Sequence, residues 1–191
     1  VNYVRGYPVT FNHEQQTEAL LAGLIEVERY VGVAGWDQPA RLFALVPTTA
    51  LLEAEPALAD QLTVTGPDAL SSIEQDGFHP GTDLMTALSR ICWPPTVAGC
   101  ALSTERSFLP AGAEQDIPAN PELAAEFVAQ HPQRQDLRVV AGAVRATDGA
   151  ILTHCVARVA TNPDDLLVGA DMVPALTQAV AWTLQDNEGN S

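Results

Sequence analysis

Apolar side chains recur at helical spacing from Leu20 to Val31, with charged residues between them. This pattern predicts an amphipathic helix with one face in the core. Asn12 and Gln15 resemble a capping box at its start. A different pattern follows over Arg41–Val46, which is apolar at every position after the arginine and has a proline on each side. Its length and its flanking prolines favour a strand in the middle of the core, buried on both faces.

Turn formers and shorter apolar runs divide the rest of the chain. We expect a short helix from Thr48 to Glu53 that restarts at Pro56, a loop over 63–81 and a helix capped by Thr82 or Asp83. A strand over about 97–109, with Gly99 as a bulge, precedes a helix over 120–131 that begins at Asn120 and buries Leu123, Phe127 and Val128. Towards the end we expect a solvated turn at Asp164-Asp165 and a C-terminal helix that is capped by Asp171 and runs to Leu184.

The clearest pattern is a β hairpin over residues 136–160. Two β-rich runs are joined by Asp148-Gly149, a preferred pair for a two-residue hairpin turn. Pairing across such a turn sets Val144 opposite Thr153 and makes one face of the hairpin mostly apolar. The other face is mixed, and on it we expect Arg145, Leu152, Ala143, His154, Ala141, Val156, Val139 and Arg158.

The predicted helices do not alternate regularly with the predicted strands, and the hairpin is antiparallel. This order indicates an α+β fold and not a parallel doubly wound sheet. We expect an antiparallel or mixed sheet of about four strands that packs with about five helices. One domain would span residues 12–185, with a flexible N-terminal extension over 1–11 and a frayed tail over 186–191.

The chain of 191 residues has a formal net charge of −15, and all nine of its basic residues are arginine. Without lysine there is no phosphate-loop lysine, no pyridoxal Schiff base and no lysine general base. The negative charge argues against nucleic acid and anionic membranes as partners. No apolar run reaches the roughly 18 residues of a membrane span. Three widely spaced cysteines suit a reducing compartment, and we expect a cytoplasmic protein.

No residue pattern predicts a metal site, a cofactor site or a catalytic centre. His13-Glu14 lacks the second histidine of a zinc-protease motif, because position 17 is threonine. His154 and Cys155 are neighbours on a strand, so their side chains point to opposite faces. There is no Gly-x-Ser-x-Gly elbow, and Cys100 and Cys155 lie in strand-like runs where a buried thiol is inert. We therefore predict neither metal nor cofactor, and we lean away from an enzyme.

Several short segments of the sequence occur together in a known pattern. They are Gly35-Trp36-Asp37-Gln38-Pro39, Trp93-Pro94-Pro95, Val97-Ala98-Gly99-Cys100-Ala101-Leu102 and Leu137-Arg138-Val139-Val140-Ala141-Gly142. In combination they resemble an uncharacterised actinobacterial protein family of unknown function, over most of residues 17–184. The resemblance implies a cytoplasmic actinobacterial protein, and it implies no activity, cofactor or site residue.

The candidate binding residues are Arg145, His154 and Arg158, which the two-residue turn places together on the mixed face of the hairpin. In so acidic a chain, positive groups beside apolar residues suit an acidic partner or a small anion. The alternative is that a helix covers this face and that the arginines pair with Asp and Glu at its rim.

Two functions follow from these observations. The first is a non-catalytic domain that binds a protein partner or its own copy, as an adaptor or chaperone-like factor. The second is a small-molecule enzyme or sensor with an anion-binding pocket on the hairpin face, in which His154 acts as acid or base and Arg145 and Arg158 hold the anion. We rank the first function above the second because no catalytic motif is found.

Overall fold

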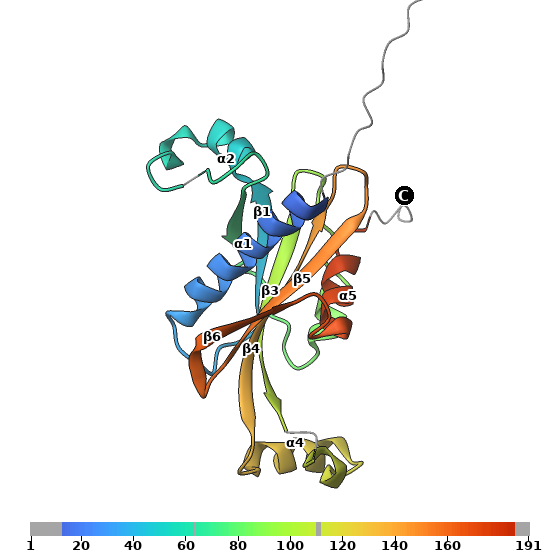
Figure 1. The fold of residues 1–191 in the computed structure, drawn as a ribbon. Coiled ribbons are helices and arrows are strands. Elements are labelled where there is room, and N and C mark those ends of the chain that lie inside the picture. Colours follow the sequence, from blue (N-terminus) through green and yellow to red (C-terminus); the bar gives the residue numbers. More distant parts are fainter. Residues whose placement is uncertain (1–12, 63, 110–111, 186–191) are drawn as a thin grey trace, which may run out of the picture.

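A six-stranded antiparallel sheet forms the centre of the protein (Figure 1). We describe it from a computed structural model, over residues 13–62, 64–109 and 112–185. The strands lie in the order β2-β1-β3-β4-β5-β6, and each runs antiparallel to its neighbours. Their bounds are β1 Arg41–Pro47, β2 Leu70–Glu74, β3 Gly99–Phe108, β4 Gln135–Arg145, β5 Ile151–Val159 and β6 Asn162–Gly169.

Helices cover both faces of the sheet. The long helix α1 (His13–Gly32) crosses one face diagonally, and α5 (Pro174–Trp182) packs with the short α3 (Leu84–Leu88) on the other face (Figure 1). Two further helical segments lie at opposite ends of the molecule: α2 (Thr48–Ala54) with the 3₁₀ turn η1 (Pro56–Leu58), and α4 (Pro121–Gln130) with the 3₁₀ turn η2 (Glu114–Asp116). The predicted α+β class and antiparallel sheet are therefore confirmed, but the sheet has six strands where about four were predicted.

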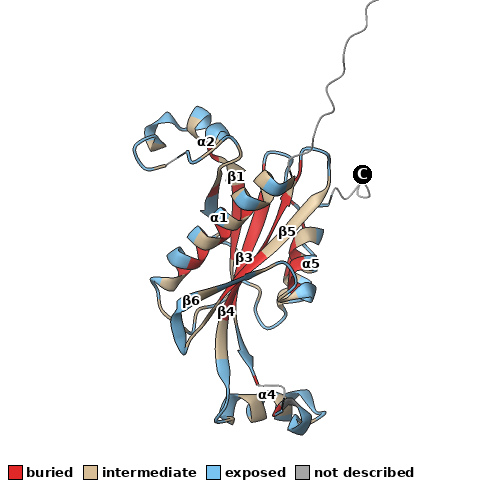
Figure 2. Cartoon of the chain, viewed as in Figure 1, coloured by how far each residue is buried: buried red, intermediate tan, exposed pale blue. Residues whose placement is uncertain are grey.

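Two apolar clusters enclose the sheet, and β1 contributes to both. Leu42 and Ala44 belong to the cluster under α5, whereas Phe43 and Leu45 belong to the cluster under α1. All four side chains are buried, as an uninterrupted apolar strand requires. Figure 2 shows that buried residues gather in the middle of the sheet and on the helices that face it, while α2 and α4 are mostly exposed.

The hairpin of β4 and β5 is confirmed, but its turn is one residue longer than predicted. The amide of Gly149 donates to the carbonyl of Ala146 (3.0 Å), and the amide of Ala146 donates to the carbonyl of Ala150 (2.7 Å). Gly149 has a φ of 87°, so it takes the left-handed position in a three-residue loop with a bulge. The register moves by one residue, and Val144 pairs with Leu152. The predicted partners across the hairpin are therefore wrong.

Both edge strands differ from the sequence-based expectation. β2 lies inside the stretch predicted as a loop, and β6 includes Asp164-Asp165, predicted as a turn. Neither has the alternation of apolar and polar residues that marks a strand, because β2 contains Ser71-Ser72 and β6 contains Pro163 and two aspartates. Pairing with one established neighbour is enough to hold such a segment in the sheet, because edge strands depend on context more than on propensity.

Three local predictions are also wrong. Helix α4 buries none of its residues, and Leu123 is 55% exposed, because the helix lies at the end of β3 and β4 and away from the sheet centre. Helix α5 begins at Pro174 and has no side-chain cap, so Asp171 does not cap it. Gly99 pairs in register with both neighbouring strands and forms no bulge. A β-carbon there would lie 2.4 Å from the carbonyl oxygen of Ala143, so the close strand approach requires glycine.

Two predicted helix starts are confirmed by their caps. The Asp83 side chain accepts the amide of Thr86 at 2.9 Å, and Asn120 accepts the amide of Glu122 at 2.9 Å. The predicted extension over 1–11, the cap at Asn12 and the tail over 186–191 lie outside the described residues. No helix in the described part of the chain combines the length and the apolar character that crossing a membrane requires.

Candidate functional site

The three residues predicted to share one face of the hairpin lie on two faces. Arg145 is two residues from Ala143, which belongs to the cluster under α5, whereas His154 and Arg158 flank Val156, which belongs to the cluster under α1. The one-residue change in register causes this separation. His154 is half-buried, and its Nδ1 lies 3.0 Å from the amide nitrogen of the adjacent Cys155. The structure thus does not assemble the predicted anion site.

Arg145 holds backbone carbonyls on the α5 side of the sheet. Its Nε donates to the carbonyl of Leu184 (3.0 Å), just beyond α5, and its Nη1 donates to Val97 (2.6 Å). Its Nη2 donates to the carbonyl of Trp93 at 3.2 Å. These bonds join the end of the last helix to the loop before β3, which is a structural use of the guanidinium.

Arg158 belongs to an ionic network beneath α1. Its Nε and Nη2 donate to the two carboxylate oxygens of Glu28 at 2.7 and 2.8 Å. Glu28 is only 2% exposed, and Arg138 lies 3.8 Å from it on the other side. Arg138 also donates to Glu105 at 3.1 Å and stacks on Trp36. Two arginines and two glutamates compensate one another here, so this network fixes α1 on the sheet. A helix therefore covers Arg158, as in the alternative interpretation, but its acidic partner is buried and does not lie at the rim.

A more promising surface lies at the opposite edge of the sheet, along β2. The amide of Thr48 donates to Ala69 and the amide of Gln75 donates to Leu42, each at 2.8 Å. Antiparallel strands alternate between residues that bond to the neighbour and residues that do not. With the observed register, the N–H and C=O groups of Leu70, Ser72 and Glu74 point away from β1, along the outer edge. These groups can accept another strand.

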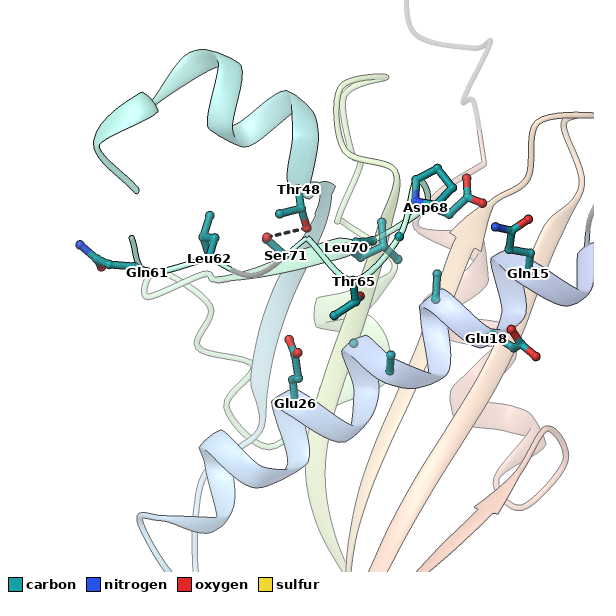
Figure 3. A pocket seen from close by; sticks show the side chains of 16 residues that line it. Gln15, Glu18, Glu26, Thr48, Gln61, Leu62, Thr65, Asp68, Leu70 and Ser71 are labelled. Carbon is teal, nitrogen blue, oxygen red and sulfur yellow. Dashed lines mark hydrogen bonds between the residues drawn. The ribbon is translucent and has the colours of Figure 1, made fainter. Parts of the chain in front are cut away.

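A cavity of about 400 Å³ opens between this edge and α1 (Figure 3). It exists because α1 presents small residues there, Ala19, Ala22 and Gly23, at helical spacing. A β-carbon added to Gly23 would come no closer than 3.9 Å to any neighbour, so there is room for a methyl group at this point. The residues labelled in Figure 3 are Gln15, Glu18, Glu26, Thr48, Gln61, Leu62, Thr65, Asp68, Leu70 and Ser71.

The floor of this cavity is polar and fixed. The hydroxyls of Thr48 and Ser71 lie 2.9 Å apart and are buried, and this bond joins the start of α2 to β2. In Figure 3, Glu26 extends from α1 toward this pair. The cavity therefore offers hydroxyl and carboxylate oxygens, which accept hydrogen bonds from a ligand.

A second cavity, of about 500 Å³, continues along the strand edge with an apolar wall. Its lining includes Leu51, Leu58 and Leu62 from the α2–η1 segment, with Ser71, Ser72, Ile73 and Glu74 of β2. Glu26, Leu62 and Ser71 line both cavities, so the two adjoin each other. We call the two cavities and the free edge of β2 the β2 groove. It combines unpaired backbone with apolar side chains, as sites for extended peptides do.

The electrostatics of the β2 groove differ from those of the sheet beside it. Glu74 is held by Arg41 through bonds of 2.6 and 2.7 Å, and this guanidinium lowers the pKa of the Glu74 carboxyl. Glu74 is one of four acids in the groove lining, and the other three are Glu18, Glu26 and Asp68; the described lining contains no basic side chain. The groove is therefore a region of negative potential.

Two of the three cysteine thiols, those of Cys100 and Cys155, are buried, and Cys92 is exposed. Burial raises the pKa of the Cys100 thiol to about 11, and burial also raises the pKa of Cys155. Both thiols are therefore protonated at neutral pH and poor nucleophiles. No group of three or more His, Cys, Asp or Glu in the described residues is arranged to hold a metal ion.

The β2 groove has no clear signature in the amino-acid sequence. Its strand was hidden in a predicted loop, and its leucines belong to a helix and a turn that are contiguous in sequence but only meet β2 in the fold. One signal was available: residues 48–69 carry acids and leucines without a base, although they flank a buried strand.

A family model described as PPA1309-like protein matches residues 20–185, and the chain therefore belongs to that family. This confirms the resemblance to an uncharacterised family. No curated protein and no solved structure matches the chain.

Proposed function

We propose that this member of the PPA1309-like family is a non-catalytic protein-binding domain of adaptor or chaperone-like type, which captures an extended segment of a partner protein in the β2 groove. The observation that carries the proposal is the outward backbone of Leu70, Ser72 and Glu74 beside an apolar wall. Main-chain bonds to a strand edge supply affinity, and side-chain pockets beside the edge supply selectivity.

The size of the groove suits a short segment. β2 has five residues, so an added strand would pair over about that length. The wall of Leu51, Leu58 and Leu62 would receive side chains from one face of that strand. Each fully buried leucine-sized side chain contributes about 1.5–3 kcal/mol, so one or two such contacts with a few main-chain bonds make a weak, reversible complex once the entropy cost of association is subtracted. The three cysteines are free thiols, which supports a reducing compartment such as the cytoplasm.

The test uses a phage-displayed library of random nine-residue peptides selected on the folded protein. Selected peptides are then measured on the wild type and on Ser72→Pro, which removes one outward amide. Proline is tolerated at an edge position whose amide faces solvent, so the fold is expected to persist. We expect at least a tenfold loss of affinity in the variant, checked by fluorescence anisotropy, with an unchanged circular dichroism spectrum.

A peptide series sharpens this test. Amide N-methylation at successive positions of a selected peptide is expected to weaken binding at every second residue, because alternate amides face the strand edge. Hydrogen exchange should slow at residues 70, 72 and 74 on binding. A uniform response to N-methylation, or protection confined to another surface, would show that strand addition at β2 is wrong.

A further inference from the structure

We infer that the segment bound in the β2 groove is basic, with arginine or lysine alternating with apolar residues. This inference rests on the proposed function and adds the chemistry of the partner. Its starting point is the contrast between paired and unpaired acids. Glu74, at one end of the groove, is held by Arg41, whereas Glu18, Glu26 and Asp68 in the rest of the groove have no ion pair or hydrogen bond among the described residues.

The alternation follows from strand geometry. Successive side chains of a strand point to opposite faces, so an added strand presents every second residue to each side. Glu26 lies on the α1 side, toward which the register turns the side chains of Ser72 and Glu74, and Ile73, which is 40% exposed, lies on the other side. Basic side chains suit the first side and apolar side chains suit the second. The aliphatic parts of the arginine or lysine side chains would also fit beside Ala22 and Gly23.

The charge of the groove excludes its most obvious competitor, a second copy of the same chain. Two β2 edges that paired with each other would bring both sets of unpaired carboxylates together in a protein of net charge −15. Like charges brought into one interface cost affinity. A basic segment of another protein has the complementary sign, and it would also associate faster at low salt.

The experiment compares three nine-residue peptides of the same length: Arg alternating with Leu and Val, the same peptide with Gln for Arg, and the same peptide with Glu for Arg. Each exposed ion pair contributes about 0.2–1 kcal/mol, so with three pairs we expect the Arg peptide to bind about tenfold more tightly than the Gln peptide at low salt. The difference should shrink at 1 M salt, where the Debye length falls to about 3 Å.

A matched pair of triple variants separates a local site from general attraction to an acidic protein. Glu18→Gln, Glu26→Gln, Asp68→Asn neutralises the groove, and Glu53→Gln, Glu55→Gln, Asp60→Asn makes the same change of charge on exposed residues outside the cavity linings. We expect the first triple to abolish the preference for the Arg peptide and the second to retain most of it.

The outcomes distinguish the two proposals. Equal loss in both triples, or equal binding of the Arg and Gln peptides with protection at β2, would overturn the basic partner and leave strand addition intact. Dimerisation of the free protein through β2 would also overturn the basic partner. If no peptide binds at β2 in this set or in the random library, both proposals fail.

Discussion

The two edge strands of the sheet, β2 and β6, differ in how their outer backbone groups are protected from pairing. An edge strand exposes unpaired backbone groups and invites another chain to pair with it. β6 begins with Asn162-Pro163-Asp164-Asp165, and proline and charge are common means of blocking such pairing. β2 has Ser71-Ser72-Ile73 along its length, and its one charged residue, Glu74, is already paired with Arg41. One edge is protected and the other is available.

The side chains around the two edges differ as well. Leu167 and Val168 of β6 are 44% and 49% exposed, but they pair with Ala157 and Val156 and therefore face opposite sides of the sheet. They do not form one apolar surface. At β2, three leucines from the α2–η1 segment line a single cavity beside the strand. In the proposed function, apolar side chains support binding where they converge on a free strand edge, as the three half-buried leucines do at β2.

The largest effect is expected from filling the groove on the α1 side. Ala22 is exposed and lines the cavity, so Ala22→Trp would place an indole where the partner strand lies. We predict at least a tenfold loss of affinity for a selected peptide, about 1.4 kcal/mol, with little change in melting temperature. Val33→Trp is the control, because Val33 is 90% exposed and does not line the groove. Equal losses in both variants would show that the α1 side of the groove is not used.

The second prediction removes the protection of β6. In the variant Pro163→Ser, Asp164→Ser, Asp165→Ser, the edge keeps Leu166 to Val168 and loses its proline and two charges. We expect the variant to self-associate more strongly than the wild type at the same concentration, as measured by sedimentation velocity. The matched control Glu53→Ser, Glu55→Ser also removes two negative charges, but away from a strand edge. If the β6 variant behaves like this control, the three residues do not protect the edge.

The third prediction concerns the attachment of β2 at acid pH. Arg41 lowers the pKa of Glu74 in the folded protein, so this pair stabilises the fold above the ordinary glutamate pKa of about 4.3, and the contribution is lost as the pH falls through the lowered folded pKa. Tyr30 also donates to Glu74, at 3.1 Å. We predict that Glu74→Gln lowers the free energy of unfolding at pH 7 and that its difference from the wild type shrinks as the pH falls below 4.

Urea unfolding at several pH values measures that difference. The variant Asp136→Asn is a useful comparison, because Arg134 lowers the pKa of Asp136 in the same way. Asp136 lies on β4, which is separated from β2 by β1 and β3. Its effect on peptide binding should be absent, whereas Glu74→Gln should weaken binding at neutral pH. A constant difference between Glu74→Gln and the wild type across the acid range would show that the ion pair does not stabilise the fold.

Much of the fold could be predicted from local pattern, and the edges could not. The apolar run of β1, the periodicity of α1 and the Asp148-Gly149 turn each act within a few residues, so the sequence shows them directly. The same turn illustrates the limit. Asp-Gly suits a two-residue loop and also the last two positions of the observed three-residue loop. Because the longer loop forms, the register of the hairpin changes by one residue, and His154 and Arg158 lie on the opposite face from Arg145.

The β2 groove depends on distances that no local pattern contains. β2 is a strand because Ile73 and Ser71 pair with β1, and the cavity is open because α1 crosses the sheet diagonally. The helix packs Leu20 and Leu24 against Gly142 of β4, whereas it presents Gly23 to Leu45 of β1 and Leu70 of β2. Only the assembled structure shows where a helix of uniform periodicity packs tightly and where it leaves space.

The smallest expected effect tests this difference in packing with two glycines. A β-carbon on Gly142 would lie 2.4 Å from Cδ2 of Leu24, whereas one on Gly23 would lie 3.9 Å from Cδ2 of Leu45. We predict that Gly142→Ala destabilises the fold by about 1–3 kcal/mol through overpacking. Gly23→Ala should stabilise it by about 0.5–1 kcal/mol, because alanine is the better helix former and meets no obstacle. Both values come from urea unfolding, and a destabilising Gly23→Ala would mean that α1 lies closer to β2 than the groove requires.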